Sequence, residues 1–433
     1  MKGKPVQVLT IIIALFILFA SQISYAESEN KPEVHSIDED TSYLPVGPNV
    51  DAASAILMES ELGQVLYKKS PNERLHISAA NKIMTCLVAI EKSGGNLDAK
   101  VTISKESVEA EGSALNLEVG EKYSLSELLY AVMLTSANDA AKAVAEFSGG
   151  DVSSFVAMMN NKASEINLKD THFTNPTGLF DENQYTTAYD VALLIKYSIS
   201  KFPEFNRIFS TQVKPWTRAN GEMHVLTSQN ELFWSYDGVD GGKTGYNNKE
   251  QQTAITTATR GNQKLICVVL DSPEQSVFPD STKILDFGFN NFRKGILVRK
   301  NDPLETVTLK ENQIHLISLI DVYYTHPIGE SYVKTLEMDI EEDLTLPIDS
   351  NRILGTAKYV LNDNTIIEVN LYSDREISIP ESFYDSMKKR FIQNKDILIL
   401  VGILLAIEVL IILYHIIRLI SKLVRKIFIS IQK

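Results

Sequence analysis

The carboxyl-terminal region most constrains what this chain can fold into, because residues 397–417 form a nearly uninterrupted apolar run. They read ILILVGILLAIEVLIILYHII, which as a helix is long enough to cross a bilayer core about 30 Å thick. Glu408 falls in the middle of the run, and we expect it to be protonated or paired rather than functional. Basic residues follow the run, as they do on the cytoplasmic side of a membrane. The sequence therefore predicts a juxtamembrane stretch at 386–396, a transmembrane helix at 397–417 and a basic cytoplasmic tail at 418–433.

The amino terminus has the pattern of a secretory signal peptide. Residues 1–26 read MKGKPVQVLTIIIALFILFASQISYA, with two lysines, an apolar run and a small-residue cleavage site in that order. An uncleaved membrane anchor is the alternative for this segment. Because basic residues lie on both sides of the carboxyl-terminal run, the predicted orientation rests mainly on this signal. We expect a single-pass protein of the cell membrane with the bulk of its chain outside the cytoplasm.

The composition of the chain limits its partners. The net charge is −13, and such an acidic chain disfavours nucleic acid as a ligand. The two cysteines, Cys86 and Cys267, each lie in an apolar context, so the chain is no disulfide-stapled scaffold. Whether they pair stays open, and we favour two buried thiols. The seven histidines include no His-x-x-x-His pair and the cysteines no Cys-x-x-Cys pair, so we expect no metal site and no cofactor.

Between the two ends the hydrophobic pattern changes from strand-like to helical and back. The polar, proline-containing residues 27–50 predict a linker. Strand-like runs flank a turn near the start and another near residue 261, and helical periodicity lies between them. The strand runs are Ala55–Glu59, Val65–Lys68, Thr253–Thr259 and Lys264–Leu270. The helical stretches begin at Ala80 and continue as Ser126–Thr135, Ala137–Phe147, Val152–Ile166 and Ala188–Ile199.

This order predicts an α/β sandwich at 51–295, in which one antiparallel sheet is built from both ends of the domain and is covered by helices. Helical periodicity disappears after residue 296, where runs such as TVTL, IHLISLI, AKYVL and IIEVNLY alternate with turn residues. We therefore expect a small all-β domain at 296–385.

Three short segments carry candidate chemistry. Ala79-Ala-Asn-Lys82 lies at the start of a predicted helix, Ser136-Ala-Asn138 lies between two helical stretches, and Lys243-Thr-Gly245 is expected to open a strand. Taken singly, Ser136 and Asn138 are equally compatible with helix capping, and Lys243 with an exposed charge at a strand end. In order and spacing the three segments resemble the Ser-x-x-Lys, Ser-x-Asn and Lys-Thr-Gly motifs of penicillin-recognising serine enzymes.

The sequence around these segments extends the resemblance. The segments ERLHISAANKIMT, LTSANDAAKAVAEFSGG, FVAMMNNKA, THFTNPTGL, YTTAYDVALL and GVDGGKTGY together resemble the D-alanyl-D-alanine carboxypeptidases, the low-molecular-weight penicillin-binding proteins of bacterial cell walls. The likeness runs from about Ala55 to Val269. It implies a β-lactamase/transpeptidase-like fold and serine-type acyl chemistry. It also implies peptidoglycan stem peptides ending in D-Ala-D-Ala as the substrate class, with β-lactams as further ligands.

The resemblance implies catalytic roles for the first two motifs. Lys82, partly desolvated, would take the proton of the nucleophilic serine. Ser136 would relay protons to the leaving D-alanine, and Asn138 would bind the substrate amide.

The resemblance implies substrate binding for the third motif. Lys243 and Thr244 would hold the terminal carboxylate of the substrate, and Gly245 would allow close backbone approach. The backbone N–H groups of Ala79 and Tyr246 would form the oxyanion hole.

The nucleophile of that family is missing from this chain. Ala79 stands where the family has serine, and the spacing from Arg74 to Lys82 is unchanged, so Ser78 has not slid into place. Ser78 is one helical turn from Lys82, but one residue of helix rotates a side chain by about 100° and shifts it roughly 1.5 Å. A misplacement of about 1 Å already costs roughly a hundredfold in rate. Ser78 also suits a helix N-cap, and we favour that role over a nucleophile.

Three functions are compatible with this sequence. The first is a membrane-anchored homologue that engages stem peptides but forms an acyl-enzyme poorly or not at all. The second is a working serine D,D-carboxypeptidase that uses Ser78. The third is a non-catalytic scaffold that recruits cell-wall machinery through its β-rich domain.

Overall fold

The computed structural model describes residues 35–36, 45–76, 78–246, 251–309, 312–329, 332–379, 387–389, 393 and 395–431. The predicted signal peptide, most of the predicted linker and most of the juxtamembrane stretch therefore lie outside the described residues. The chain divides into two units. The first comprises the residues up to Asp302 with Ser318–Ile340 and Gly355–Leu371, and the second comprises Pro303–Ile317, Glu341–Leu354 and the residues from Tyr372 onward.

A five-stranded sheet in the first unit is built from both ends of the α/β domain. Its order is β3-β2-β10-β9-β8, and each neighbouring pair is antiparallel. The strands are β2 (Ser54–Glu59), β3 (Val65–Lys69), β8 (Val239–Tyr246), β9 (Gln251–Arg260) and β10 (Gln263–Pro273). The two predicted hairpins, β2–β3 and β9–β10, are confirmed.

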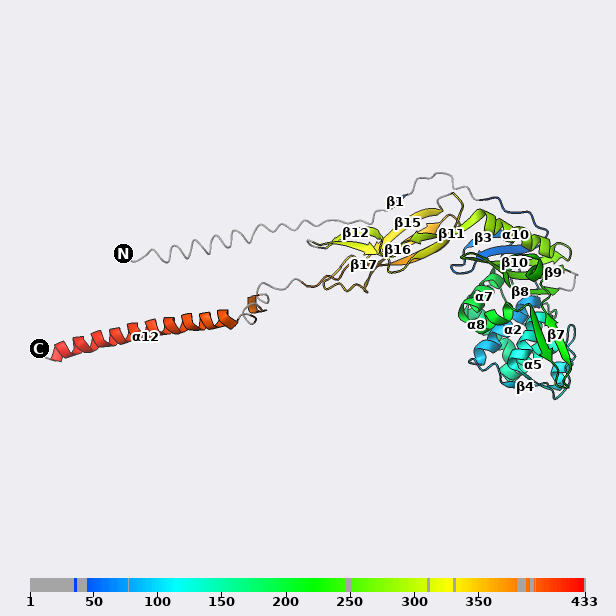
Figure 1. Ribbon diagram of the computed structural model, residues 1–433, viewed down its shortest axis with the longest axis horizontal. Coiled ribbons are helices and arrows are strands. Elements are labelled where there is room, and N and C mark those ends of the chain that lie inside the picture. The colour runs from blue at the N-terminus through cyan, green and yellow to red at the C-terminus, as the bar shows by residue number, and fades with distance from the viewer. Residues whose placement is uncertain are drawn as a thin grey trace. The chain divides into compact units, whose positions relative to one another are not determined.

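Alternation of side chains along these strands creates two cores. In β2, Ile56 and Met58 belong to the core that the sheet shares with the central helices, whereas Ala55 and Leu57 belong to a core that includes Ile284 of α10 (Val277–Asn291). Figure 1 shows α10 on one face of the sheet and α2, α7 and α8 on the other. The sheet is therefore buried on both faces, as the predicted sandwich requires.

The predicted helical stretches are confirmed to within a few residues as α2 (Ser78–Lys92), α4 (Leu125–Thr135), α5 (Asn138–Gly149), α6 (Val152–Glu165) and α7 (Ala188–Lys201). The sequence pattern did not predict α10 or the short helices α3 (Lys105–Val108), α8 (Pro203–Phe209) and α9 (Leu232–Ser235). Two small two-stranded sheets that the sequence pattern does not predict complete the domain: β4 (Lys100–Thr102) pairs with β5 (Lys122–Ser124), and β6 (Val213–Thr217) pairs with β7 (Met223–Thr227). Local signals fix several helix starts; Ser124 and Glu127 form a capping box at α4.

The prediction that Lys243 opens a strand was wrong. Strand β8 begins at Val239, and the Lys-Thr-Gly motif lies in its second half. The glycines before the motif suggest a turn, but they lie within the strand because its neighbours leave no room for a side chain. A Cβ at Gly241 would lie 2.5 Å from the ring of Phe209, and one at Gly242 would overlap the amide of Asn230.

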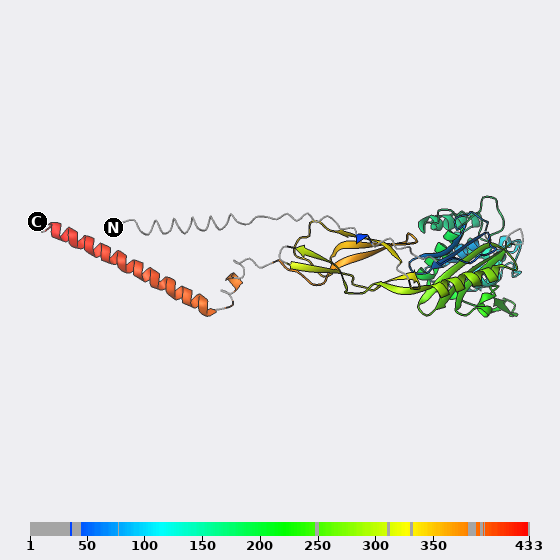
Figure 2. The same ribbon diagram turned by 90° about the horizontal axis from the view of Figure 1, so that it is seen from above.

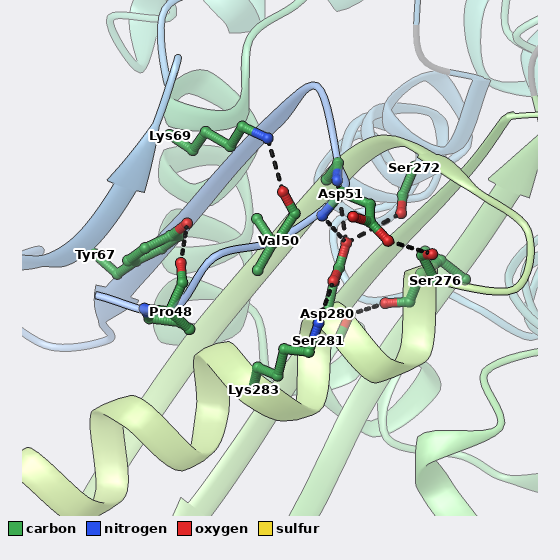
Figure 3. A network of polar contacts seen from close by, with 12 residues as sticks. Pro48, Val50, Asp51, Tyr67, Lys69, Ser272, Ser276, Asp280, Ser281 and Lys283 are labelled. Carbon is green, nitrogen blue, oxygen red and sulfur yellow. Dashed lines mark hydrogen bonds and ion pairs between the residues drawn. The ribbon is translucent and has the colours of Figure 1, made fainter. Parts of the chain in front are cut away.

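A strap ahead of β2 is bound to the end of the domain. The carboxylate of Asp280, on α10, accepts hydrogen bonds from the backbone N–H groups of Asp51 and Ala52 at 2.8 and 3.0 Å. Lys69 donates to the carbonyl oxygen of Val50 at 2.8 Å, and Figure 3 shows these contacts along one continuous stretch of chain. Asp280 is fully buried, so residues 48–52 belong to the folded domain although the predicted linker extends to residue 50.

The β-rich region begins at residue 292. A two-stranded sheet pairs β11 (Phe292–Val298) with β14 (Val322–Pro327). A six-stranded sheet has the order β1-β15-β16-β17-β13-β12. Its strands are β1 (His35–Ser36), β12 (Pro303–Leu309), β13 (Asn312–Ile317), β15 (Val333–Ile340), β16 (Ile353–Leu361) and β17 (Ile366–Ser373). The predicted β-rich domain is thus confirmed as an all-strand region.

Within the first unit, Gln64 joins the turn after β2 to strand β14. Its side-chain amide donates to the carbonyl oxygen of Thr325 at 2.9 Å, and its oxygen accepts from the N–H of Thr325 at 2.7 Å. Gln64 is fully buried. Its side-chain amide therefore pairs with the backbone of Thr325 in the way that a peptide group of a neighbouring strand would.

The chain ends in one long helix, α12 (Lys395–Ile431), drawn as a continuous ribbon in Figure 2. Its stretch Ile399–Val424 has a mean hydropathy of 2.7 and none of it is buried against protein. By length and composition this helix can cross a membrane, and it contains the whole predicted span at 397–417.

Candidate active site

Lys82 lies in a helix that is almost wholly buried. Helix α2 begins at Ser78, and its residues from Ala79 to Ile90 are all buried, since apolar side chains surround it on several sides. The side chain of Lys82 donates a hydrogen bond to the backbone oxygen of Thr177. Burial lowers the pKa of Lys82 to about 8. This amine is therefore poised to exchange a proton near neutral pH.

Ser136 and Asn138 occupy a sharp junction between two helices. Helix α4 ends at Thr135, and Ser136 follows in a left-handed conformation with φ 59° and ψ 28°. Asn138 then begins α5 and donates from its amide nitrogen to the carbonyl oxygen of Glu111 at 2.7 Å. Its side-chain oxygen is buried and accepts no hydrogen bond from the described residues. A buried acceptor without a donor is rare, and this one is available to a ligand N–H.

Lys243 connects the third motif to the second. Its amine donates to the hydroxyl oxygen of Ser136 and, at 2.9 Å, to the carbonyl oxygen of Thr244. Burial, and after it the positive charge of Lys82, lowers the pKa of Lys243 to about 7. The hydroxyl of Ser136 donates in turn to the side-chain oxygen of Gln229 at 3.4 Å. The structure thus brings the three motifs together from α2, the α4–α5 junction and β8.

The end of β8 passes very close to the start of α2. A Cβ at Gly245 would lie 2.8 Å from the hydroxyl of Ser78 and 3.1 Å from both the N and the Cβ of Ala79. A glycine is therefore needed at 245 if the strand is to reach the helix. Thr244 is buried, whereas Tyr246 is 56% exposed at the end of the strand.

Ser78 is the first residue of α2, and its hydroxyl donates to the carbonyl oxygen of Tyr246 at 3.0 Å. It thus links α2 to β8, a contact that differs from the N-cap interaction that we expected. Among the described residues, no hydrogen bond joins Ser78 to Lys82, whose amine contacts Thr177 instead. The side chain of Ala79, where the resemblance implies a nucleophile, is 1% exposed.

The loop of residues 175–179 belongs to the segment THFTNPTGL of the resemblance, but the sequence alone predicts no role for it. The side-chain oxygen of Asn175 accepts from the N–H of Thr177 at 3.2 Å and from the N–H of Gly178 at 2.7 Å. Gly178 has φ +76°, and a Cβ there would lie 2.5 Å from the carbonyl oxygen of Ser78. The loop therefore packs on the first turn of α2 and supplies the acceptor for Lys82.

The two cysteines are free, buried thiols, as expected. Cys86 lies one turn after Lys82 on α2, and burial raises its pKa to about 12. It is therefore a protonated, unreactive side chain behind the two lysines.

Comparison with known proteins agrees with this geometry. Residues 41–274 match the family of D-alanyl-D-alanine carboxypeptidases, and residues 292–378 match the C-terminal domain of penicillin-binding protein 5. The chain is 32% identical to the D-alanyl-D-alanine carboxypeptidase DacF of Bacillus subtilis (strain 168) over 359 residues, which cover 80% of this chain and 88% of the relative.

Solved structures of proteins similar to this chain have the same fold. Penicillin-binding protein 5 of Haemophilus influenzae superimposes with a TM-score of 0.65 at 28% identity, covering 77% of this chain and 100% of its own. The DD-transpeptidase of Streptomyces K15 superimposes with a TM-score of 0.54 at 30% identity, covering 57% and 100%. The predicted transpeptidase-like α/β domain followed by a β-rich domain is confirmed. The chain therefore belongs to the D-alanyl-D-alanine carboxypeptidase family and carries, later in its sequence, the C-terminal domain of penicillin-binding protein 5.

Proposed function

We propose that this chain is an exported, membrane-anchored member of the family that binds peptidoglycan stem peptides ending in D-Ala-D-Ala and forms an acyl-enzyme poorly or not at all. In this proposal residues 1–26 direct export, residues 51–295 bind the peptide, and residues 397–417 hold the protein in the cytoplasmic membrane. The length and apolar composition of α12 support the anchor.

The observation that carries the proposal is an assembled site around a side chain that cannot react. Lys82 contacts the 175–179 loop and Lys243 contacts Ser136, while position 79 presents only a methyl group. Without an oxygen at 79, this position offers no nucleophile to the carbonyl carbon of a stem peptide or a β-lactam. Loss of the serine from a serine hydrolase lowers kcat on the order of a millionfold, and binding with oxyanion stabilisation supplies what activity remains.

The remaining groups are those that recognise a peptide. The free side-chain oxygen of Asn138 would accept the N–H of the substrate amide. The amine of Lys243 and the Thr244 hydroxyl would hold a terminal carboxylate. The backbone N–H groups of Ala79 and Tyr246 would receive the carbonyl oxygen next to it.

Labelling with a fluorescent penicillin, followed by gel electrophoresis, tests this proposal. We expect no labelled band from the wild-type protein and a band from Ala79→Ser, because that change restores the missing oxygen beside Lys82. Ala79→Ser combined with Lys82→Met is the matched control and should again give no band, because the base is then absent.

Two outcomes would contradict the proposal. A band from the wild-type protein that disappears in Ser78→Ala would show that Ser78 is a working nucleophile. Failure of the wild-type protein to bind any stem peptide, together with an unlabelled Ala79→Ser variant, would favour a scaffold in which the motif residues no longer act.

A further inference from the structure

Lys82 and Lys243 form a pair of buried amines without a carboxylate partner among the described residues. Lys82 is 5% exposed and Lys243 is 2% exposed, and within the described ranges neither amine forms an ion pair with a carboxylate. Lys162 provides a contrast, because it is equally buried but contacts the carboxylates of Glu91 and Glu165 at 2.7 and 2.6 Å. Burying a charge without a partner is unfavourable, so the site around Lys82 and Lys243 should attract an anion.

The two amines differ in how many acceptors the protein gives them. A lysine ammonium has three N–H donors. The described residues supply two acceptors to Lys243, the hydroxyl of Ser136 and the carbonyl oxygen of Thr244. They supply one to Lys82, the carbonyl oxygen of Thr177. Lys82 is therefore the amine with more unused hydrogen-bonding capacity, and the substitution at position 79 is the reason, since a serine hydroxyl there would be a further acceptor.

The start of α2 adds a second feature that favours an anion at this place. Ala79 is the second residue of the helix, and the first N–H groups of a helix have no acceptor within it. The positive end of the helix dipole also favours a carboxylate there. Gly245 brings β8 against the same N–H group, so an oxygen bound here is enclosed by the two elements and Lys82.

We propose, on the basis of the function proposed above, that this site prefers stem peptides already trimmed to a free carboxylate at the position of the scissile carbonyl over peptides that still carry the terminal D-Ala. One oxygen of that carboxylate lies at the Ala79 N–H, where the carbonyl oxygen of a substrate would lie. The other fills the place of the absent serine hydroxyl and accepts from Lys82. An intact D-Ala-D-Ala terminus offers a single neutral amide oxygen at the same position, and hydrogen bonds to a charged acceptor are about twice as strong.

The proposal reverses the usual relation between enzyme and product. In a carboxypeptidase the trimmed peptide is the product and leaves, whereas here it is the preferred ligand. Restoring the serine should therefore weaken binding of the trimmed peptide, because the new hydroxyl occupies the place of the carboxylate oxygen and takes the hydrogen bond from Lys82.

Calorimetric titration of the full-length protein in detergent micelles with three synthetic probes tests this. The probes are diacetyl-L-Lys-D-Ala with a free carboxylate, the same peptide with a carboxyl-terminal amide, and diacetyl-L-Lys-D-Ala-D-Ala. We expect the free acid to bind at least tenfold more tightly than its amide and more tightly than the longer peptide. Lys82→Met should remove the difference between acid and amide, Ala79→Ser should weaken acid binding at least fivefold, and Lys162→Met, the matched control, should change neither.

The outcomes separate the two proposals. Equal affinity for acid and amide, or tighter binding of the longer peptide, would overturn the preference for trimmed stems but leave stem-peptide binding in place. Absence of binding by all three probes would overturn both. A melt recorded by tryptophan fluorescence shows whether each variant is folded, since Trp216 and Trp234 both lie in the α/β domain.

Discussion

Replacing Lys82 by methionine should stabilise the α/β domain at neutral pH although it removes a residue of the proposed site. Methionine has nearly the same length and shape but no charge, so the core around α2 keeps its packing. The change removes a buried ammonium group that has no carboxylate partner in the described part of the chain. Its expected signature is a gain of stability that depends on pH.

The lowered pKa of Lys82 sets the size of this effect. Burial lowers the pKa from 10.5 to about 8, and each pKa unit corresponds to about 1.4 kcal/mol. Below pH 8 both the folded and the unfolded protein carry the proton, and a penalty of about 3 kcal/mol opposes folding. Between pH 8 and pH 10.5 the folded protein has released the proton while the unfolded chain still holds it, so stability rises with pH.

The methionine variant should lose this dependence. At pH 7 it gains about 3 kcal/mol from the missing charge and loses about 1 kcal/mol because the Thr177 carbonyl oxygen is left without its donor. The net gain of about 2 kcal/mol corresponds to a rise in Tm of roughly 4–8 °C for a domain of this size. By pH 9.5 most of the penalty is relieved in the wild-type protein, so the difference in Tm should fall close to zero.

Thermal unfolding at pH 7 and pH 9.5, followed by tryptophan fluorescence, measures both quantities. Lys162→Met is the matched control, because its amine is paired with two glutamates and its removal should not stabilise the protein at either pH. A Tm of Lys82→Met at or below that of the wild type at pH 7 would refute the reasoning. A gain in Tm that is the same at both pH values would do so too, because it would have to come from packing.

Two further pairs of substitutions test the contacts that hold the site and the strap. Gly178→Ala should destabilise the domain by at least about 2 kcal/mol, because its Cβ would overlap the backbone of Ser78. Gly120 has a similar positive φ but open space around it, so Gly120→Ala should lower the stability by only about 1 kcal/mol. Equal losses of Tm in the Gly178→Ala and Gly120→Ala variants would contradict the steric argument. Asp280→Ala should lower the stability of the domain by about 2–4 kcal/mol, because two backbone N–H groups lose their acceptor. Asp280→Asn keeps an acceptor oxygen, so it should lower the Tm less in the same thermal unfolding experiments. A smaller loss for Asp280→Ala than for Asp280→Asn would rule out this role.

The sequence allowed the fold to be predicted wherever periodicity was regular. The hairpin β2–β3 and the helices α4 to α7 were located to within a few residues because alternating or helical apolar patterns continue through them. Strand β8 was misplaced because its glycines, which suggest a turn, lie beside Phe209 and Asn230, where a side chain would not fit. Both of these neighbours lie outside the strand, so the local sequence of β8 does not show that a side chain would not fit there.

The candidate site was predicted as a list of residues but not as a network of contacts. The motifs located Lys82, Ser136 and Lys243, and the structure shows which of them touch. The contact between Lys82 and Thr177 joins residues 95 positions apart, and the left-handed conformation of Ser136 follows from the junction of two packed helices. Ser78 was expected to cap α2, and only the close approach of β8 explains its hydrogen bond to Tyr246.

The binding of the strap to Asp280 has a consequence for how this protein matures. The N–H of Ala52 finds its acceptor 228 residues later in the chain, and the strand that follows the strap is flanked on one side by β10. In the export proposed above, a chain that emerges from its amino terminus must therefore wait, with an unpaired strand edge exposed, until α10 has also emerged. Such long-range closure is slow, so we expect the domain to become resistant to proteases only after the chain has emerged past Asn291, where α10 ends.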